Sequence, residues 1–243
     1  MSELACESLR EPGSWRCLEI VYRNEPRKLL DRFFLSSSSA RGARNRLEVL
    51  KREICEGIRE TARVNNPVRL ISYGSGPGHE ILACVDTFRG EAAVEGVCVD
   101  RDQSALRYGH ALAVGKGLEG QIRYVQGDVL CMEAAGQHDL AILSGLIDYF
   151  GFETAVSVLT RIREQLRPGG TVLLANMRHH RLASVMSVLG NWHLVYREPE
   201  EVRALLAESG YQQICVWVES TGVFCIGKGK KRTSGNSAAR SGS

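Results

Sequence analysis

The stretch from Val68 to Gly78 constrains the fold of this chain more than any other part of its sequence. Its first half is a short apolar run, which predicts a buried strand, and its second half carries three glycines on alternate positions. From His79 to Phe88 apolar residues recur at helical spacing, so the whole segment predicts a strand, a tight turn and a helix. Glycine permits positive φ angles in such a turn and lets a ligand approach the N–H groups of the helix start. The alternative is a turn that needs glycine for its geometry alone.

The rest of the chain repeats this alternation of strand and helix. Apolar runs at 93–99, 122–126, 139–144 and 171–177 predict further strands, and helical spacing predicts helices over 103–115, 153–166 and 199–209. Two short runs at 214–218 and 223–226 predict a closing hairpin. We therefore expect an α/β fold: a doubly wound, Rossmann-like sheet of seven strands, mostly parallel, with an antiparallel hairpin at the C-terminal end.

Polar and glycine residues gather at the ends of these strands, where sheets of this kind bind ligands. A carboxylate has two acceptor oxygens and suits a vicinal diol, so the acid that ends the second strand is a candidate ligand residue. The alternative is that these acids only cap helices and close turns. The candidate binding residues are Tyr73, Gly74, Ser75, Gly76, Gly78, Asp100, Arg101, Gly127, Asp128, Val129, Ser144 and Gly145.

The chain before the first strand predicts helices. Arg27 to Leu35 predicts a short helix, and Ala40 to Val64 a long amphipathic helix with a basic start, which Ser39 would cap. Residues 1–23 give no clear pattern. We expect a helical extension over 1–65 that covers the site as a lid and completes the substrate pocket but not the cofactor pocket, a ligand-binding domain over 66–227, and a disordered basic tail over 228–243.

Charge and cysteine usage narrow the choice of partners. The net charge is +3, but five basic residues fall in the last sixteen positions, and without them 26 basic residues face 28 acidic ones. This balance argues against a nucleic-acid surface on the folded body. The eight cysteines form no Cys-x-x-Cys pair, which predicts neither a disulfide framework nor a metal site. The sequence has no apolar run as long as a membrane span, and its first residues are acidic, so we expect a cytoplasmic protein. The sequence does not indicate the oligomeric state.

These motifs together resemble the class I S-adenosylmethionine-dependent methyltransferases over residues 66–227. The matching features are the Gly74-x-Gly76-x-Gly78 turn, Asp100, the Gly127-Asp128 pair, the run from Leu166 to Gly170, and the closing hairpin. The resemblance implies that the glycine backbone lies along the methionine part of the cofactor. It also implies that Asp100 accepts hydrogen bonds from both ribose hydroxyls, and that Asp128 accepts one from the adenine amino group, with Val129 beside the ring. The chain departs from the family at Ser72, where an acidic residue usually stands two positions before the first glycine.

A narrower resemblance concerns the substrate. Three segments, 38–47, 144–150 and 192–197, are similar to bacterial methyltransferases assigned to the synthesis of 3-hydroxypalmitic acid methyl ester. This resemblance implies O-methylation of the carboxyl group of a fatty or hydroxy acid. The arginine usual after the glycine turn is replaced here, where His79 and Glu80 stand.

The chemistry of methyl transfer sets the candidate catalytic residues. Holding the nucleophile in line with a sulfonium methyl supplies much of the rate, and an ionised carboxylate needs no base, whereas a hydroxyl or an amine generally does. We expect Tyr149 to face the sulfonium through its aromatic ring and Arg197 to bind a substrate carboxylate. His179 is the first candidate base. Further candidate bases are His180, His193 and Asp148, and further candidate carboxylate ligands are Arg44 and Arg46; solvated surface positions and core packing are the alternatives for all of these.

Three other functions use parts of the same pattern. An NAD-dependent dehydrogenase shares the strand, the glycine turn and the acid, but it expects Gly or Ala where His79 stands. A protein that keeps the fold and only binds a partner would not need the acids at the strand ends. An RNA methyltransferase would need a basic face, which only the tail supplies. We therefore favour a small-molecule methyltransferase; an N-, C- or O-methyltransferase of a secondary-metabolite precursor with a histidine base is the nearest alternative.

Overall fold

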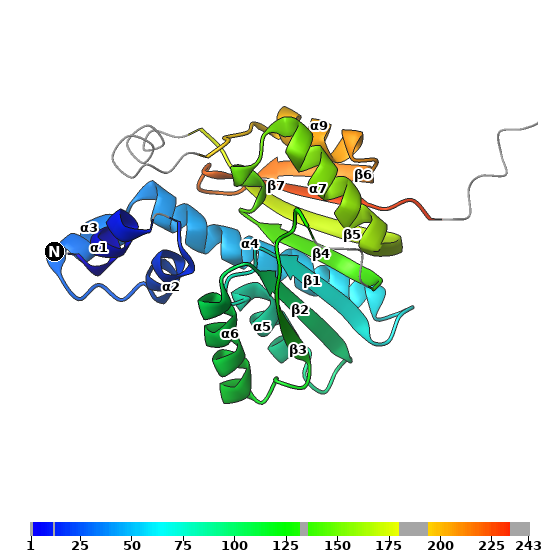
Figure 1. The fold of residues 1–243 in the computed structure, drawn as a ribbon, viewed down its shortest axis with the longest axis horizontal. Helices are drawn as coiled ribbons and strands as arrows, with labels where there is room; N and C mark the ends of the chain where they lie inside the picture. The colour runs from blue at the N-terminus through cyan, green and yellow to red at the C-terminus, as the bar shows by residue number, and fades with distance from the viewer. Residues whose placement is uncertain (1, 12, 132–135, 180–193, 234–243) are drawn as a thin grey trace, which may run out of the picture.

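The computed structural model describes residues 2–11, 13–131, 136–179 and 194–233. Its centre is a seven-stranded sheet with the strand order β3-β2-β1-β4-β5-β7-β6 (Figure 1). All neighbouring strands pair in parallel except β7, which runs antiparallel to both β5 and β6. The predicted α/β sheet with its C-terminal hairpin is therefore confirmed. The strands are β1 Val68–Tyr73, β2 Val94–Asp100, β3 Ile122–Gln126, β4 His138–Ser144, β5 Leu166–Met177, β6 Gln212–Val218 and β7 Phe224–Lys230.

Helices cover both faces of the sheet. Each face of the sheet carries a cluster of buried side chains. The helical residues of one cluster come mainly from α4 and α5, and those of the other from α7 and α9 (Figure 1). Alternate residues of β1 show the division, since Leu70 belongs to the first cluster and Ile71 and Tyr73 to the second. The helices that pack on the two faces are α4 Ser38–Thr61, α5 His79–Thr87, α6 Gln103–Lys116, α7 Phe152–Gln165 and α9 Pro199–Glu208. A short 3-10 helix, η1, lies at Ile147–Tyr149.

The N-terminal residues form a small helical lobe at one end of α4 (Figure 1). Its helices are α1 Glu3–Arg10, α2 Trp15–Arg23 and α3 Leu29–Leu35. Residues 1–23, which gave no clear sequence pattern, thus contain two helices, and serine hydroxyls cap both: Ser2 accepts from Ala5 N–H and Ser14 from Cys17 N–H. The cap of α4 is Ser37, two residues earlier than the expected Ser39.

Two expected domain boundaries need correction. The long helix α4 does not belong to a separate lid, because Leu50, Ile54 and Ile58 are fully buried in the main core. The tail does not begin at residue 228, because β7 continues to Lys230 and pairs with β5 over its whole length, with Thr171 opposite Lys230. Backbone pairing extends this strand through 227–230, although the Gly-Lys-Gly-Lys sequence there has no apolar side chain. The described part of the chain therefore has one buried cluster on each face of the sheet and a smaller N-terminal core.

Candidate functional site

The glycine turn joins β1 to α5 at the carboxyl end of the sheet. Gly74, Gly76 and Gly78 have φ angles of +59°, +53° and +76°, which glycine adopts without strain. Gly78 also lacks room for a side chain, because a Cβ atom there would collide with the sulfur of Cys98. Conformation therefore requires glycine at all three positions, and space requires it at Gly78 as well.

Asp100 ends β2 and lies directly against this turn. Its Oδ2 accepts a hydrogen bond from the Gly76 N–H at 2.7 Å, and its Oδ1 accepts from the Asp102 N–H at 2.8 Å. Each carboxylate oxygen has a second lone pair, so the half-buried group retains acceptor capacity for a ligand. The contact joins the ends of two neighbouring strands into one polar surface.

The remaining binding candidates lie at four strand ends and differ in their contacts. The Gly127 N–H donates to the Asp100 carbonyl at 3.0 Å, which ties the end of β3 to that of β2. Asp128 is exposed and caps its own turn, since its Oδ1 accepts from Leu130 N–H at 2.9 Å. Ser144 ends β4, and Gly145 follows with a φ angle of +81°. Arg101 is exposed, Val129 is half-buried against the core, and Ser75 is buried with its hydroxyl donating to the Gly76 carbonyl.

Tyr73 does not present its side chain to this surface. Its ring is fully buried on the α7 side of the sheet, and its hydroxyl bonds to Gln165 at 2.6 Å. Burial raises the pKa of this phenol far above its usual value. The candidate residue Tyr73 can therefore meet a ligand at the turn through its backbone and not through its side chain.

A buried cation, Arg46, lies against the segment that follows β4. Arg46 comes from α4 and lies against Gly145, where a Cβ atom would stand 2.7 Å from its Nη1 and 3.4 Å from Asp148 Oδ2. The guanidinium stacks over the Phe224 ring at 4.8 Å and donates to the Tyr22 hydroxyl at 3.0 Å. Burial alone would lower the pKa of Arg46, but the Tyr22 phenol and the carboxyl groups of Asp148 and Glu80 raise it. A glycine is thus needed at 145 to admit this cation.

Asp148 is buried beneath the same segment. Burial raises its pKa to about 7, although the hydrogen bond from Met177 N–H and the charges of Arg46 and Arg197 lower it. Its Oδ1 accepts from Met177 N–H at 2.9 Å. The group is 3% exposed, so as a base it would have to act through a small local movement or through water.

Arg197 has a different place from the one expected. Its guanidinium is buried and donates to the carbonyls of Ile147 and Phe150 and to the Asn176 amide oxygen, the last at 2.8 Å. These bonds fix the 147–150 segment against the end of β5. Arg44 is likewise engaged with backbone, since it donates to the carbonyls of Val21 and Leu35 in the N-terminal lobe. Both arginines position the protein's own chain.

Tyr149 and His179 lie at the open end of the site. Tyr149 is 48% exposed in η1, and His179 is exposed with its ring edge-on to Tyr196 at a centroid distance of 5.6 Å. Both positions allow contact with a bound molecule. The other two candidate bases, His180 and His193, lie outside the described residues, and so does the segment 182–189, whose apolar spacing also predicts a short helix.

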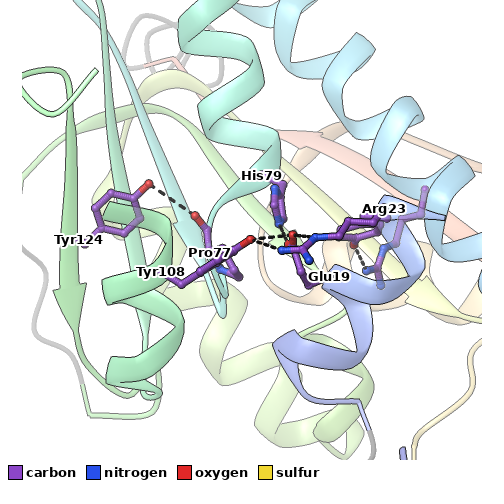
Figure 2. A network of polar contacts seen from close by, with 8 residues as sticks. Glu19, Arg23, Pro77, His79, Tyr108 and Tyr124 are labelled. Carbon is purple, nitrogen blue, oxygen red and sulfur yellow. Dashed lines mark hydrogen bonds and ion pairs between the residues drawn. The ribbon is translucent and has the colours of Figure 1, made fainter. Parts of the chain in front are cut away.

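Helix α2 covers the glycine turn (Figure 2). Glu19 accepts from the ring nitrogen of His79 at 2.7 Å and from the hydroxyl of Tyr108 at 2.8 Å, and Arg23 donates to both Glu19 and Tyr108. Trp15 stacks on Tyr108 at 4.9 Å, donates to Ser104 at 3.1 Å, and is the side chain that a Cβ on Gly76 would meet. The N-terminal lobe therefore contacts the glycine turn itself, which corrects the expectation that it would complete only the substrate pocket.

Sequence reasoning missed three residues of this site. Trp15 and Tyr22 fall in the part of the chain that gave no pattern, and only their contacts reveal them. Glu80 was noticed as a departure from the family but not as a site residue. Its signal was available, because an acid is missing at Ser72 and one stands at the start of the following helix.

Two solved structures share this fold. A solved structure of magnesium protoporphyrin IX methyltransferase from Synechocystis PCC 6803, with S-adenosylhomocysteine bound, superposes with a TM-score of 0.64 at 8% identity and covers 95% of each chain. A protein from Bordetella parapertussis, described as a possible exported protein, superposes with a TM-score of 0.81 at 20% identity over 96% of this chain and 84% of its own. The fold is that of the methyltransferases.

The sequence comparison then gives the family. The family described as "putative methyltransferase" matches residues 12–231, and the chain belongs to it. The chain is 26% identical over 235 residues to the uncharacterized protein YnbC of Escherichia coli K12, with 88% of this chain aligned. It spans 40% of the length of that protein. Within the described ranges, every helix is too short or too polar to span a lipid bilayer.

Proposed function

We propose that the protein transfers a methyl group from S-adenosylmethionine to a small-molecule acid. The observation that carries the cofactor assignment is the bond between Asp100 and the Gly76 N–H, which places an acid and the glycine turn side by side at adjoining strand ends. Family membership supports the same assignment. A nucleoside with a polar tail fits this donor and acceptor set, because the acid accepts from a diol and the turn donates from its backbone.

In this proposal the protein's own residues bind and orient. The free lone pairs of Asp100 accept from the ribose hydroxyls, and Asp128 accepts from the adenine amino group beside Val129. The cofactor supplies an activated methyl group on a sulfonium sulfur. Tyr149 turns its exposed ring toward that cation. Arg197 holds the 147–150 segment in place, so it acts on the reaction through Tyr149 and not by contact with the substrate.

We propose an amphipathic carboxylic acid as the acceptor. Three large apolar or aromatic side chains are exposed near the ends of β4 and β5, namely Tyr149, Phe152 and Val195, and they offer a surface for an apolar chain. Among the arginines expected to bind a carboxylate, Arg46 is the one whose Nη1 makes no hydrogen bond within the described part of the chain. A carboxylate held there needs alignment with the methyl group and no proton transfer.

The test uses S-adenosylmethionine labelled in its methyl group and a panel of fatty, hydroxy and aromatic acids, alcohols and amines. Mass spectrometry identifies the labelled product. Mild alkaline hydrolysis then distinguishes the acceptor atom, because a methyl ester releases the label as methanol while ethers, N-methyl and C-methyl products keep it. Label that survives hydrolysis in every product contradicts the carboxylate assignment, and no transfer to any compound contradicts the activity on this panel. Asp100→Ala is the negative control.

A histidine-assisted transfer to a hydroxyl is the second candidate, and the exposed position of His179 beside Tyr196 favours it. His179→Ala should then lower kcat at neutral pH by about 10²-fold or more, with the KM for the acceptor nearly unchanged. If the acceptor is instead a carboxylate, His179→Ala should lower kcat only modestly.

A further inference from the structure

The carboxylate of Glu80 is buried at the carboxyl end of β1. Glu80 stands in the first turn of α5 and is 5% exposed, and its Oε1 accepts from the Ser72 hydroxyl at 2.9 Å. Ser72 lies two residues before Gly74 and is itself fully buried. The bond therefore holds the carboxylate beneath the glycine turn, next to the strand position at which β1 carries no acid.

This carboxylate is short of partners within the protein. Among the described residues, Ser72 is its one hydrogen-bond donor, and no lysine, arginine or histidine nitrogen forms an ion pair with it. Buried carboxylates are costly unless they are paired and hydrogen-bonded. The charge of Glu80 acts on two buried neighbours, the Arg46 cation and the Cys98 thiol. Burial raises the pKa of the Cys98 thiol, and the Glu80 charge raises it further. A vacant acceptor oxygen at this depth matches a cationic group brought by a ligand.

Only one part of the proposed cofactor has such a group near the turn. The amino-acid end of S-adenosylmethionine carries a primary ammonium, which donates three hydrogen bonds and prefers an ionised acceptor. Asp100, at the end of the neighbouring strand, accepts a backbone N–H on each of its oxygens, and the proposed function uses its remaining lone pairs for the ribose hydroxyls. Glu80 is thus the acid of this turn whose second oxygen is left for an ammonium.

We propose that Glu80, oriented by Ser72, binds the ammonium of the cofactor's amino-acid end, so that an acid on α5 takes the place of an acid on β1. The inference rests on the proposed use of S-adenosylmethionine. It predicts that Glu80 contributes to the binding of ligands that carry the amino-acid end and contributes nothing to the binding of the nucleoside alone.

The experiment compares two ligands by titration calorimetry, S-adenosylhomocysteine and 5′-methylthioadenosine, which lacks the amino-acid end. Glu80→Gln should weaken S-adenosylhomocysteine by about 10- to 100-fold, the effect of losing one charge-assisted hydrogen bond, and change 5′-methylthioadenosine by less than about 2-fold. Asp100→Ala should weaken both ligands. Asp86→Asn, which alters a partly exposed carboxylate on the same helix that pairs with Lys116, is the matched control and should change neither.

A double variant keeps the test decisive if Glu80→Gln folds poorly. Ser72→Asp combined with Glu80→Gln returns the acid to the strand and should restore most of the affinity for S-adenosylhomocysteine. Equal weakening of both ligands by Glu80→Gln, or of neither, overturns the role of Glu80, as does a double variant that binds no better than Glu80→Gln. If the unaltered protein binds neither ligand, the proposed function fails before this inference is reached.

Discussion

Replacement of Arg197 distinguishes a positioning role from substrate binding. The guanidinium is 3% exposed and donates to two carbonyls and one amide oxygen, so Arg197→Ala leaves three buried acceptors without a donor and a cavity beside them. Breaking a buried charged network of this kind costs about 3–5 kcal/mol. We therefore expect Arg197→Ala to act first on stability.

The corresponding change in Tm follows from the size of the chain. Unfolding releases about 2.1 cal/mol/K per residue, which for 243 residues is about 0.5 kcal/mol/K. The loss of 3–5 kcal/mol then lowers Tm by about 6–10 °C, measured by calorimetry or circular dichroism. The matched control is Arg203→Ala, because this exposed arginine donates one bond to the Ile214 carbonyl at 3.0 Å. It should shift Tm by less than about 2 °C.

The same variant separates the two roles in the enzyme assay. If Arg197 only bound a substrate carboxylate, Arg197→Ala would raise the KM for the acid and leave Tm close to that of the unaltered protein. A change in Tm below about 2 °C would therefore refute the positioning role.

Three further perturbations test other parts of the site. Burial raises the pKa of Asp148 from an ordinary 3.8 to about 7, so the carboxyl loses its proton at lower pH in the unfolded chain, and the stability that Asp148 contributes falls as pH rises from about 4 through about 7. Between pH 5 and pH 8 the Tm of Asp148→Asn should therefore fall less than the Tm of the unaltered protein. Parallel curves of Tm against pH would exclude this linkage. Gly145→Ala should cost about 1–3 kcal/mol through its φ angle and its clash with Arg46, whereas Gly115→Ala, where a Cβ meets nothing within 4 Å, should be neutral or stabilising in urea unfolding. Trp15→Ala should speed S-adenosylhomocysteine release by about 10-fold in displacement experiments, since it removes the stack on Tyr108 and the bond to Ser104, and an unchanged release rate would remove α2 from the cofactor site.

The sequence was sufficient for the sheet because its signals are local. The apolar run of β1, the three glycines and the start of α5 are contiguous, and periodicity predicts each without knowledge of the fold. Ile122–Gln126 was predicted with its observed bounds. The closing strand β7 was placed four residues too short, because its extension to Lys230 depends on backbone pairing with β5 and not on side-chain pattern.

The site was harder to predict because its contacts are not local. Arg197 has the residue type of a carboxylate ligand, and only the fold shows that carbonyls from the 147–150 segment surround it. Glu80 and Ser72 are eight residues apart, on different elements, and their bond depends on how α5 packs against β1. Residue type indicates what a side chain can bind, whereas packing decides which partner it meets.

Titration of the protein with S-adenosylhomocysteine and, separately, with NAD⁺ tests the central claim most directly. We expect saturable, one-site binding of S-adenosylhomocysteine that Asp100→Ala weakens by about 10-fold or more, because the acid at the end of β2 would lose its bonds to the ribose, and no binding of NAD⁺. Binding of NAD⁺ in preference to S-adenosylhomocysteine, or an affinity for S-adenosylhomocysteine that Asp100→Ala leaves unchanged, would contradict the assignment of this strand-end surface as the cofactor site.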